Sequence, residues 1–539
     1  MRKLFPYAQM RPFLYLLILV AFGGLLFFSN IGGWDLWNPD EPRYAQIARE
    51  MLQGEGWIIP HLNSEVYYDK PPLFFWMIAG SAKLLREMNE AAARLPSAFF
   101  GLLTLILTFF FSKELFDERT GLFSALVLAT SGEFFWLARR ANIDATLTFF
   151  TTLTIYLFWT GYKGERGRRW LCYIGAYLVM ATGFLVKLQP AVIVPFLAVG
   201  GYFLWKKESK FFADLAHIAG IALFMSIIGG WLYLAYLAAG KDYLQGLLFE
   251  KTALTFFKTR GHLRPFYYYL LNFPADFLPW TPFLPAAIVY GLKGEREKTV
   301  FLLLWFSSVF LFFSFAKAKR ELYLLPIYPA AAIMVGRVWA CFAGSEKWPK
   351  LLLWPLFLLI LISLVVGLSS PFMSIKFGQP YFSNALEVGL FTASIFTGGG
   401  LLSLFLYRKE KKGTLFFVIV SMVFFLEIYG VFRIFPEVNR YKSARPLSQK
   451  IVETFKPGDL LGVYKLEGAD INYYTGINPI VRIEEEGDLR KFLELERRAL
   501  CVIKKRHFKK LSPSLKERIF IVAEGRIGHR RLFVISNRR

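Results

Sequence analysis

The sequence is poor in cysteine and has none of the common nucleotide-binding signatures. Cys172, Cys341 and Cys501 are the only cysteines in 539 residues, and their spacing fits neither a metal site nor a disulfide framework. No Walker A loop, Rossmann fingerprint or zinc-protease motif occurs. An activated group for any transfer reaction would therefore have to arrive on a carrier other than a bound nucleotide.

A signal-peptide cleavage site and internal repeats are also missing. The basic start Met1-Arg2-Lys3 precedes a long apolar run, and no small-residue site closes that run, so we expect an uncleaved first helix. Many transporters contain two related halves, and this sequence has no obvious repeat. A lipid transporter or flippase, or a structural membrane scaffold, remains an alternative on composition alone.

Long apolar runs are abundant. The chain is 55% hydrophobic and 18% aromatic, with a mean hydropathy of +0.40. Apolar runs of about 18 or more residues recur from Pro12 to Val431, which predicts an all-α polytopic membrane domain with about thirteen spans. The net charge of +24 comes largely from loops between these runs. Basic loops set topology and contact anionic lipid, so we expect membrane lipids rather than nucleic acid as partners.

The run 71–85 decides the topology. It is too short to span comfortably and carries Lys83, with Arg86 and Glu87 directly after it. If it lies on the outer surface as an interfacial helix, the short basic loops 162–169, 206–210, 293–298 and 408–412 all become cytoplasmic, as the positive-inside rule requires. The first loop, 31–93, then faces outward with its interfacial helices, and so does Asp144.

The last 100 or so residues differ from the rest in composition. Residues 437–539 are more polar than the transmembrane domain 1–436, and they contain short β-like runs at 460–464, 499–504, 519–522 and 531–536 with a charged helical stretch at 488–498. This pattern predicts a small C-terminal α/β domain outside the cytoplasm.

Two adjacent acids follow the first apolar run. After Asp40 and Glu41, apolar residues fall at helical spacing, and Gly54 provides a natural stop, so we expect a short amphipathic helix on the membrane. A structural interpretation is that Asp40 caps this helix, with Pro42 in its first turn. A functional interpretation is that these acids act on a group at the bilayer surface, because an unpaired charge there is costly.

Three further segments are candidates for chemistry. Lys70, within Tyr67-Tyr68-Asp69-Lys70-Pro71, could form a surface ion pair or bind a phosphate. Asp144 begins a predicted span, close to Arg139 and Arg140. We interpret it either as a helix cap that pairs with Arg140 or as an acid with a functional role. Basic clusters at 258–269 and 317–326 face outward against the usual charge bias, which indicates an anionic ligand such as a lipid phosphate; headgroup binding without chemistry is the alternative. His262 and Asp69 are candidates to share a divalent ion.

Taken together, these motifs resemble a known family. The stretches 38–45, 67–71, 94–98 and 142–144 are similar to the GT-C glycosyltransferases of the protein O-mannosyltransferase type, and most similar to the lipid A aminoarabinose transferase branch. The likeness extends over most of the chain up to about residue 330, and the expected spans with an external C-terminal domain match that branch. The chain has Asp-Glu-Pro-Arg-Tyr and Asp69-Lys70-Pro71 where the family has Asp-Glu-Thr-Arg-Tyr and Glu-Lys-Pro, which leaves the sugar open.

The resemblance implies transfer of a sugar, with inversion, from a polyprenyl-phosphate donor on the outer face of the inner membrane. It implies catalytic roles for Asp40 and Asp144, and we add Glu41 as their neighbour. The residues expected at the donor phosphate are Lys70, Arg264, Arg260, Arg320 and Tyr323. Those expected at the substrate are Tyr67, Tyr68, His262 and Lys317, with Asp69 and His262 as the speculative metal ligands.

The acceptor decides what the carboxylates do. A hydroxyl acceptor, as in protein mannosylation, needs a base, and Asp40 is the natural candidate. A lipid A phosphate is already ionised, so the carboxylates could orient it or hold the ammonium of an amino sugar. We expect 4-amino-4-deoxy-L-arabinose transfer to lipid A by a monomer with no required cofactor, with protein or another glycan as alternative acceptors.

Overall fold

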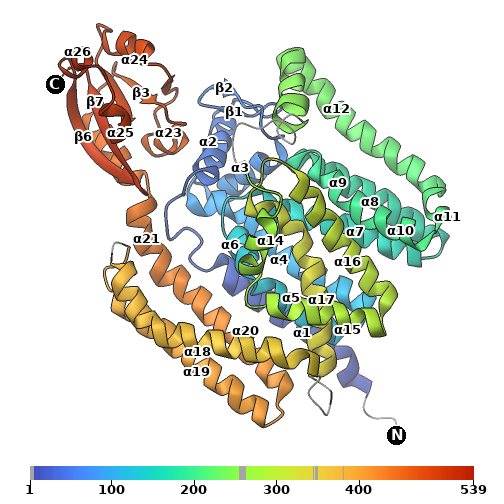
Figure 1. Cartoon of the computed structure of the whole chain (residues 1–539). Helices are drawn as coiled ribbons and strands as arrows, with labels where there is room; N and C mark the ends of the chain where they lie inside the picture. The colour runs from blue at the N-terminus through green and yellow to red at the C-terminus, as the bar shows by residue number, and fades with distance from the viewer. Residues whose placement is uncertain (1–4, 254–262, 344, 346–349, 380, 539) are drawn as a thin grey trace.

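Helices make up most of the chain. The structure is a computed structural model that describes residues 5–253, 263–343, 345, 350–379 and 381–538. The helices up to the end of the last predicted span are α1 (Phe5–Phe28), α2 (Asp40–Leu52), α3 (Leu73–Leu85), α4 (Glu90–Leu115), α5 (Glu118–Ala129), α6 (Gly132–Ala138), α7 (Ile143–Lys163), α8 (Arg166–Lys187), α9 (Pro190–Pro195), α10 (Gly201–Lys206), α11 (Ser209–Phe212), α12 (Leu215–Gln245), α14 (Tyr268–Asp276), α15 (Leu284–Gly294), α16 (Arg296–Phe315), α17 (Tyr328–Phe342), α18 (Lys350–Gly378), α19 (Ala385–Arg408) and α20 (Lys412–Tyr429). Figure 1 shows them packed side by side, with α18, α19 and α20 forming a layer along one flank.

The helical membrane domain is confirmed. Within the described residues, eight helices are long and apolar enough to cross a membrane, or nine if the bent pair α5 and α6 is one span. Helices α1 (24 residues) and α7 (21 residues), both predicted as spans, are not among these eight, and the predicted span 189–205 forms a shorter apolar helix, Pro190–Lys206. The predicted total of about thirteen spans is therefore larger than the number of described helices that have both the length and the apolar composition needed to cross a bilayer.

One predicted span, near 276–291, is interrupted. Helix α14 ends at Asp276, a 3-10 turn covers Thr281–Phe283, and α15 begins only at Leu284. Prolines are the physical reason, because this stretch contains Pro274, Pro279, Pro282 and Pro285, and each removes a backbone donor and obstructs the preceding turn. The segment is therefore two short helices rather than one continuous span.

The first outer loop forms a small layer of its own. It contains α2, the short antiparallel pair β1 (His61–Leu62) and β2 (Glu65–Val66), and α3. The apolar face of α2 packs on α3 as the spacing predicts: the ring of Tyr44 lies 5.8 Å and 5.5 Å from those of Phe74 and Phe75. Helix α2 ends at Leu52, and Gly54 has a φ of +105°, a conformation that favours glycine. This packing fixes the start of α2, where the candidate acids lie.

The C-terminal part is a small α/β domain, as predicted. Its elements are α21 (Phe435–Lys442), α22 (Arg445–Thr454), β3 (Leu460–Tyr464), α23 (Ala469–Thr475), β4 (Val481–Ile483), α24 (Glu486–Leu493), β5 (Ala499–Lys504), α25 (Lys505–Phe508), α26 (Pro513–Lys516), β6 (Phe520–Ile527) and β7 (Arg530–Ser536). The sheet order is β4-β3-β5-β7-β6, in which β4, β3 and β5 are parallel and the β5–β7 and β7–β6 pairs are antiparallel. The predicted domain boundary at 436/437 falls inside α21, which continues from α20 as one helical stretch, Lys412–Lys442.

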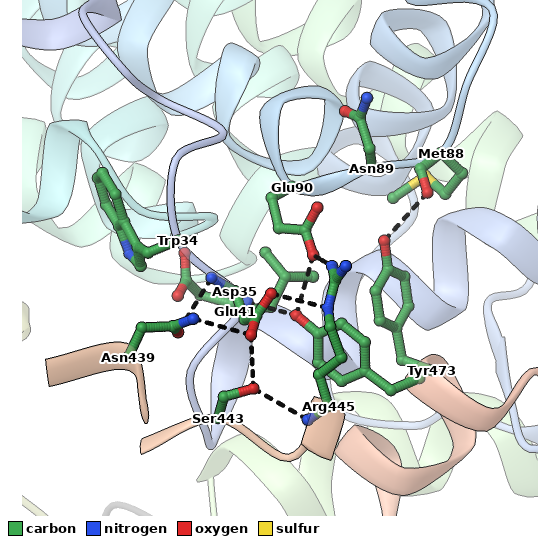
Figure 2. Close-up of polar contacts among 12 residues, drawn as sticks. Trp34, Asp35, Glu41, Met88, Asn89, Glu90, Asn439, Ser443, Arg445 and Tyr473 are labelled. Atoms are coloured by element: carbon green, nitrogen blue, oxygen red, sulfur yellow. Dashed lines mark hydrogen bonds and ion pairs between the residues drawn. The ribbon is translucent and has the colours of Figure 1, made fainter. Parts of the chain in front are cut away.

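The C-terminal domain, which the loop charges predict outside the cytoplasm and which we call the outer domain, is attached directly to the first loop. Asp35 accepts hydrogen bonds from Asn439 (2.8 Å) and Ser443 (2.6 Å), and its other oxygen lies 2.8 Å from the Arg445 guanidinium (Figure 2). Arg445 also pairs with Glu90, the first residue of the long helix α4. The C-terminal domain therefore lies beside α2, β1 and β2 in Figure 1.

Candidate active site

Asp40 is the first residue of α2, and its carboxylate faces a basic residue far away in sequence. Arg320 Nη2 donates to Asp40 Oδ2 at 2.6 Å, and Arg43 Nη1 lies 3.8 Å from Asp40 Oδ1. The position before the helix is Pro39, which makes no side-chain capping hydrogen bond. The side chain of Asp40 is thus engaged with two guanidinium groups, and the cap position belongs to Pro39.

The electrostatics keep Asp40 ionised. Burial by itself would raise the pKa of Asp40, but the charge and hydrogen bond of Arg320, with Arg43 and Arg140 nearby, lower that pKa below its ordinary value. The same pairing raises the pKa of Arg320 despite its burial. The result is a buried carboxylate that stays charged at neutral pH and is held in one orientation.

Glu41, the next residue, has a closed environment. Arg94 Nε donates to its Oε1 at 2.8 Å, and Arg140 Nη2 donates to its Oε2 at 3.2 Å. The backbone N–H groups of Trp37 (2.9 Å) and Ala141 (3.1 Å) donate to the same carboxylate. Burial opposes ionisation, yet Arg94 and Arg140 lower the pKa of Glu41 to about 2. The contacts of Glu41 therefore join α2, α4 and the segment before α7. The sequence predicted Glu41 as a catalytic residue, and that role stays a prediction.

Asp144 pairs with a residue that the sequence pattern did not single out. The ammonium of Lys187, the last residue of α8, donates to the Asp144 carboxylate. The helix cap of α7 is Asn142, whose side chain accepts from the backbone N–H of Asp144 at 2.8 Å. The sequence-based alternative of a cap paired with Arg140 is therefore wrong. Lys187 also lies over the ring of Tyr323, 4.8 Å from its centroid.

Lys70 lies among these groups. Its Nζ donates to the backbone oxygen of Asp69 at 2.8 Å. Burial is the main reason that its pKa falls to about 8; Lys187 lowers it further, whereas Asp69, Asp40 and Asp144 raise it. The structure thus brings Asp40, Lys70, Asp144 and Lys187 into one electrostatic neighbourhood, although they lie on four separate segments.

The paired tyrosines frame this neighbourhood. Tyr67 is buried, its ring lies 6.0 Å from that of Phe75, and burial followed by Asp69 raises its pKa. Tyr68 packs against Tyr243 near the end of α12, with ring centroids 5.7 Å apart. Both were predicted to contact substrate, and that role stays a prediction.

The two predicted basic segments meet each other. Leu263 and Ala318 form an antiparallel bridge, and the N–H of Arg264 donates to the Lys317 carbonyl at 3.4 Å. Arg264 and Lys317 are exposed, with the Arg264 guanidinium 5.5 Å from the centre of the Tyr268 ring. Arg260 and His262 lie outside the described residues.

A cavity of about 220 Å³ opens beside Asp40. Its polar lining includes residues that sequence reasoning missed, Glu133 on α6 and Glu321 at the start of the turn before α17. The remaining lining residues are Pro39, Asp40, Glu41, Trp136, Leu137, Arg140, Ala141, Asn142, Arg320 and Leu322. Asp40 therefore borders a space large enough for part of a substrate.

The divalent-ion hypothesis receives no support from geometry. Among the residues that the structure describes, no three His, Cys, Asp or Glu side chains come together in a way that could hold a metal ion. Asp69 is described, but its proposed partner His262 is not. The metal site stays a prediction.

Two missed residues carried only weak sequence signals. Lys187 ends an apolar helix, where a lysine is commonly explained by its reach to the membrane surface. Glu133 was counted inside a continuous span, but the chain bends by 73° between α5 and α6, and Glu133 lies just after that bend. A glutamate in the middle of an apolar run was the available signal for the second residue.

The arrangement suits the transfer of a group between anionic partners. Lysines and arginines can neutralise a phosphate that gains charge as a bond breaks. The ionised carboxylates can orient or deprotonate an incoming group. All of these groups lie on loop segments or at the ends of helices, where a lipid headgroup could reach them.

Comparisons with known proteins agree with this geometry. Residues 69–234 match the family described as dolichyl-phosphate-mannose-protein mannosyltransferase. An undecaprenyl phosphate-alpha-4-amino-4-deoxy-L-arabinose arabinosyl transferase of Pseudomonas aeruginosa (strain UCBPP-PA14) is 31% identical over 324 residues, which cover 59% of this chain and 58% of that relative. The match thus spans less than two thirds of the transferase's length. An uncharacterized protein of Aquifex aeolicus (strain VF5) is 28% identical over 466 residues, 85% of each chain.

The fold comparison reaches across the whole chain. The crystal structure of ArnT from Cupriavidus metallidurans bound to undecaprenyl phosphate superposes with a TM-score of 0.80, covering 97% of this chain and 98% of that one at 19% sequence identity. The chain therefore shares the fold of that structure, the GT-C fold that the motifs predicted, in a helical membrane domain. In sequence it is similar to the undecaprenyl phosphate-aminoarabinose transferases, in agreement with the branch that the motifs indicated.

Proposed function

We propose that this protein transfers a sugar, 4-amino-4-deoxy-L-arabinose, from undecaprenyl phosphate to a phosphate of lipid A. The observation that carries the proposal is the convergence of Asp40, Asp144, Lys70 and Lys187 within a GT-C fold. The similarity to named aminoarabinose transferases supports the choice of donor and sugar. The reaction would take place on the periplasmic face of the inner membrane, in agreement with the charge distribution of the loops.

The chemistry is a single displacement. An oxygen of the acceptor phosphate supplies an electron pair to the anomeric carbon of the sugar, and the bond between that carbon and the donor phosphate oxygen breaks. The bonding pair leaves with undecaprenyl phosphate, so the anomeric configuration inverts. The leaving phosphate gains negative charge, which Lys70 and Lys187 are positioned to stabilise.

The carboxylates have a different task with this acceptor. Because a phosphate monoester is already ionised at neutral pH, the reaction needs no strong base. Asp40, fixed by Arg320, and Asp144, fixed by Lys187, would then orient the sugar and limit the approach of the acceptor to one direction. With a hydroxyl acceptor, Asp40 would instead remove the proton.

A second candidate is transfer of mannose to a protein hydroxyl. The observation in its favour is the match of residues 69–234 to the dolichyl-phosphate-mannose-protein mannosyltransferase family. The two candidates differ in the carrier-bound sugar and in the acceptor, and not in the expected position of the leaving group.

The test is a matched set of reactions with the purified full-length protein. It would be incubated with undecaprenyl-phosphate aminoarabinose or with polyprenyl-phosphate mannose, each with lipid A or with a Ser/Thr-rich peptide. Mass spectrometry is expected to show aminoarabinose on lipid A. A mannosylated peptide with unmodified lipid A would replace the first candidate by the second.

A further inference from the structure

The outer domain carries a group of cations at one edge of its sheet. Lys504 ends β5, and its ammonium donates to the backbone oxygen of Lys465, directly after β3, at 3.2 Å. Arg530 begins β7 beside the end of β6. We call this group the cationic edge; it consists of Lys465, Lys504, Arg506, Lys510 and Arg530.

The members of the cationic edge influence one another. Burial followed by the charges of Arg506, Lys504, Lys465 and Lys510 lowers the pKa of His507, which lies among them. Burial followed by Arg530 and Arg506 lowers the pKa of Lys504. Like charges held this close repel, so the folded domain keeps an arrangement that a bound anion would stabilise.

These cations differ from the ion-paired arginines of the same domain. Arg445, Arg498 and Arg518 each lie within ion-pair distance of a carboxylate: Asp35 or Glu90, Asp459, and Glu494, respectively. Within residues 381–538, which the structure describes without a gap, no carboxylate forms an ion pair with a member of the cationic edge. The charge of Glu484 acts to raise the pKa of Lys504, but the two side chains are too far apart for an ion pair. The edge therefore has unneutralised positive charge.

The cationic edge is linked to the candidate active site by one charge interaction and by the contacts of two neighbouring acids. The charge of Arg530 acts on Asp470, whose carboxylate accepts a hydrogen bond from the Asn38 side chain. Asn38 lies two residues before Asp40. From the adjacent turn, Glu467 forms a bidentate pair with Arg43, at 2.6 Å and 2.7 Å. The residues that adjoin the edge, Glu467 and Asp470, thus contact the start of α2.

We propose that the cationic edge binds the phosphorylated headgroup of the lipid acceptor and holds it next to Asp40. The edge occupies the carboxyl ends of parallel strands β3 and β5, which is the side of such sheets where ligands commonly bind. Guanidinium and ammonium groups are the usual partners of phosphate. The inference rests on the proposed function, because it takes a phosphate-bearing lipid as the acceptor.

Kinetics with full-length protein in phosphatidylcholine nanodiscs would test this role. Arg506→Glu/Arg530→Glu inverts two exposed charges of the edge, and Lys491→Glu/Arg518→Glu inverts two exposed charges on α24 and after α26 as the matched control. We expect the KM for lipid A to rise about tenfold or more in the first variant, with kcat and the donor KM unchanged. The control should stay within about twofold of the unmodified protein. Equal KM values in the two variants would overturn the proposal.

A binding measurement separates this inference from the proposed function, because it needs no turnover. Lipid A, enzymatically dephosphorylated lipid A and inorganic pyrophosphate would each be titrated by microscale thermophoresis. The proposal expects binding of lipid A that requires its phosphates and weakens in the neutral variant Arg506→Gln/Arg530→Gln. Unchanged lipid A affinity in that variant, or pyrophosphate binding as tight as lipid A, would contradict a lipid-headgroup site. Phosphate-dependent binding without sugar transfer would instead count against the proposed function.

Discussion

Asp40 and Glu41 are neighbours at the start of α2, but their carboxylates lie in different environments. Both residues line the cavity, but Asp40 shares its charge with Arg320 and Arg43, two side chains that are partly open to solvent. Glu41 is 1% exposed and is enclosed by Arg94, which is completely buried, and by backbone donors. The difference shows that burial and charge alone do not identify a catalytic acid. The useful distinction is whether the carboxylate has a face left for a substrate.

The arginines that pair with these two carboxylates differ in the same way. Arg94 donates to the carbonyls of Ile31, Trp34 and Asp35 as well as to Glu41, so its hydrogen-bonding capacity is taken up within the protein. Arg320 uses its guanidinium on Asp40 at the cavity and remains partly exposed. We therefore propose that Glu41 holds the first loop in place and that Asp40 takes part in the reaction.

Removal of the Glu41 side chain is expected to have the largest effect, a loss of folding stability. Glu41→Ala would leave Arg94 and Arg140 without their buried carboxylate, at a cost of about 3–5 kcal/mol of stability. Thermal unfolding in detergent and the yield of monodisperse protein measure this loss. A variant that melts like the unmodified protein would show that the network is not needed to hold the loop.

Neutralising Asp40 is expected to have the second-largest effect, a loss of turnover. Asp40→Asn keeps the shape but removes the charge that faces Arg320, and we expect transfer to fall about 100-fold or more. The melting temperature should change by much less than in Glu41→Ala. Normal transfer by folded Asp40→Asn would mean that the carboxylate is structural on this side of α2 as well.

Lys187 should behave like the Asp40 side, although it ends a span. Lys187→Met removes the partner of Asp144 and one of the cations near Lys70, and we expect transfer to fall about 100-fold. Lys163→Met at the end of α7, where the ammonium lies over Trp159, is the matched control and should retain near-normal rates. Equal activity of the two variants would show that Lys187 does not contribute to the reaction.

A pH profile tests Lys70 without changing the fold. Because the pKa of Lys70 is lowered to about 8, chiefly by burial, this group loses its proton as pH rises through that value. The donor kcat/KM should then decrease, about tenfold per pH unit well above 8, because the phosphate-binding charge disappears. Lys70→Arg, whose side chain stays protonated, should lack this decrease even if its overall rate is lower. A flat profile to pH 10 in the unmodified protein would contradict the assignment.

The smallest effect is expected where the outer domain contacts α2. Glu467→Gln weakens the bidentate contact with Arg43, and since Glu467 is largely exposed, we expect only a few-fold change in transfer. Steady-state kinetics at two salt concentrations would measure it. A loss as large as that of Asp40→Asn would make the outer domain part of the catalytic machinery rather than a support for it.

Several elements of the site could be predicted from local sequence. Asp40, Lys70 and Asp144 stand out because charged residues beside apolar runs are costly and need a partner. The helical spacing after Asp40 predicted α2, and the β-like runs predicted four strands of the outer sheet. Each of these signals lies within one short stretch of chain.

The partners could not be predicted in the same way. Arg320 reaches Asp40 across 280 positions, and Lys187 reaches Asp144 across 43, so only the packing of the helices brings them together. Strand β4 was missed because it has three residues at a sheet edge, too few for a periodic signal. The bend before Glu133 was missed because hydropathy does not distinguish a broken helix from a straight one.

The release of undecaprenyl phosphate tests the central claim most directly. Equal amounts of folded unmodified protein and Asp40→Asn would be incubated with undecaprenyl-phosphate aminoarabinose and lipid A, and both lipid products would be quantified by mass spectrometry. We predict one undecaprenyl phosphate released for each sugar added to lipid A by the unmodified protein, and at least about 100-fold less by Asp40→Asn. Failure of the folded unmodified protein to release undecaprenyl phosphate from this donor would contradict the account.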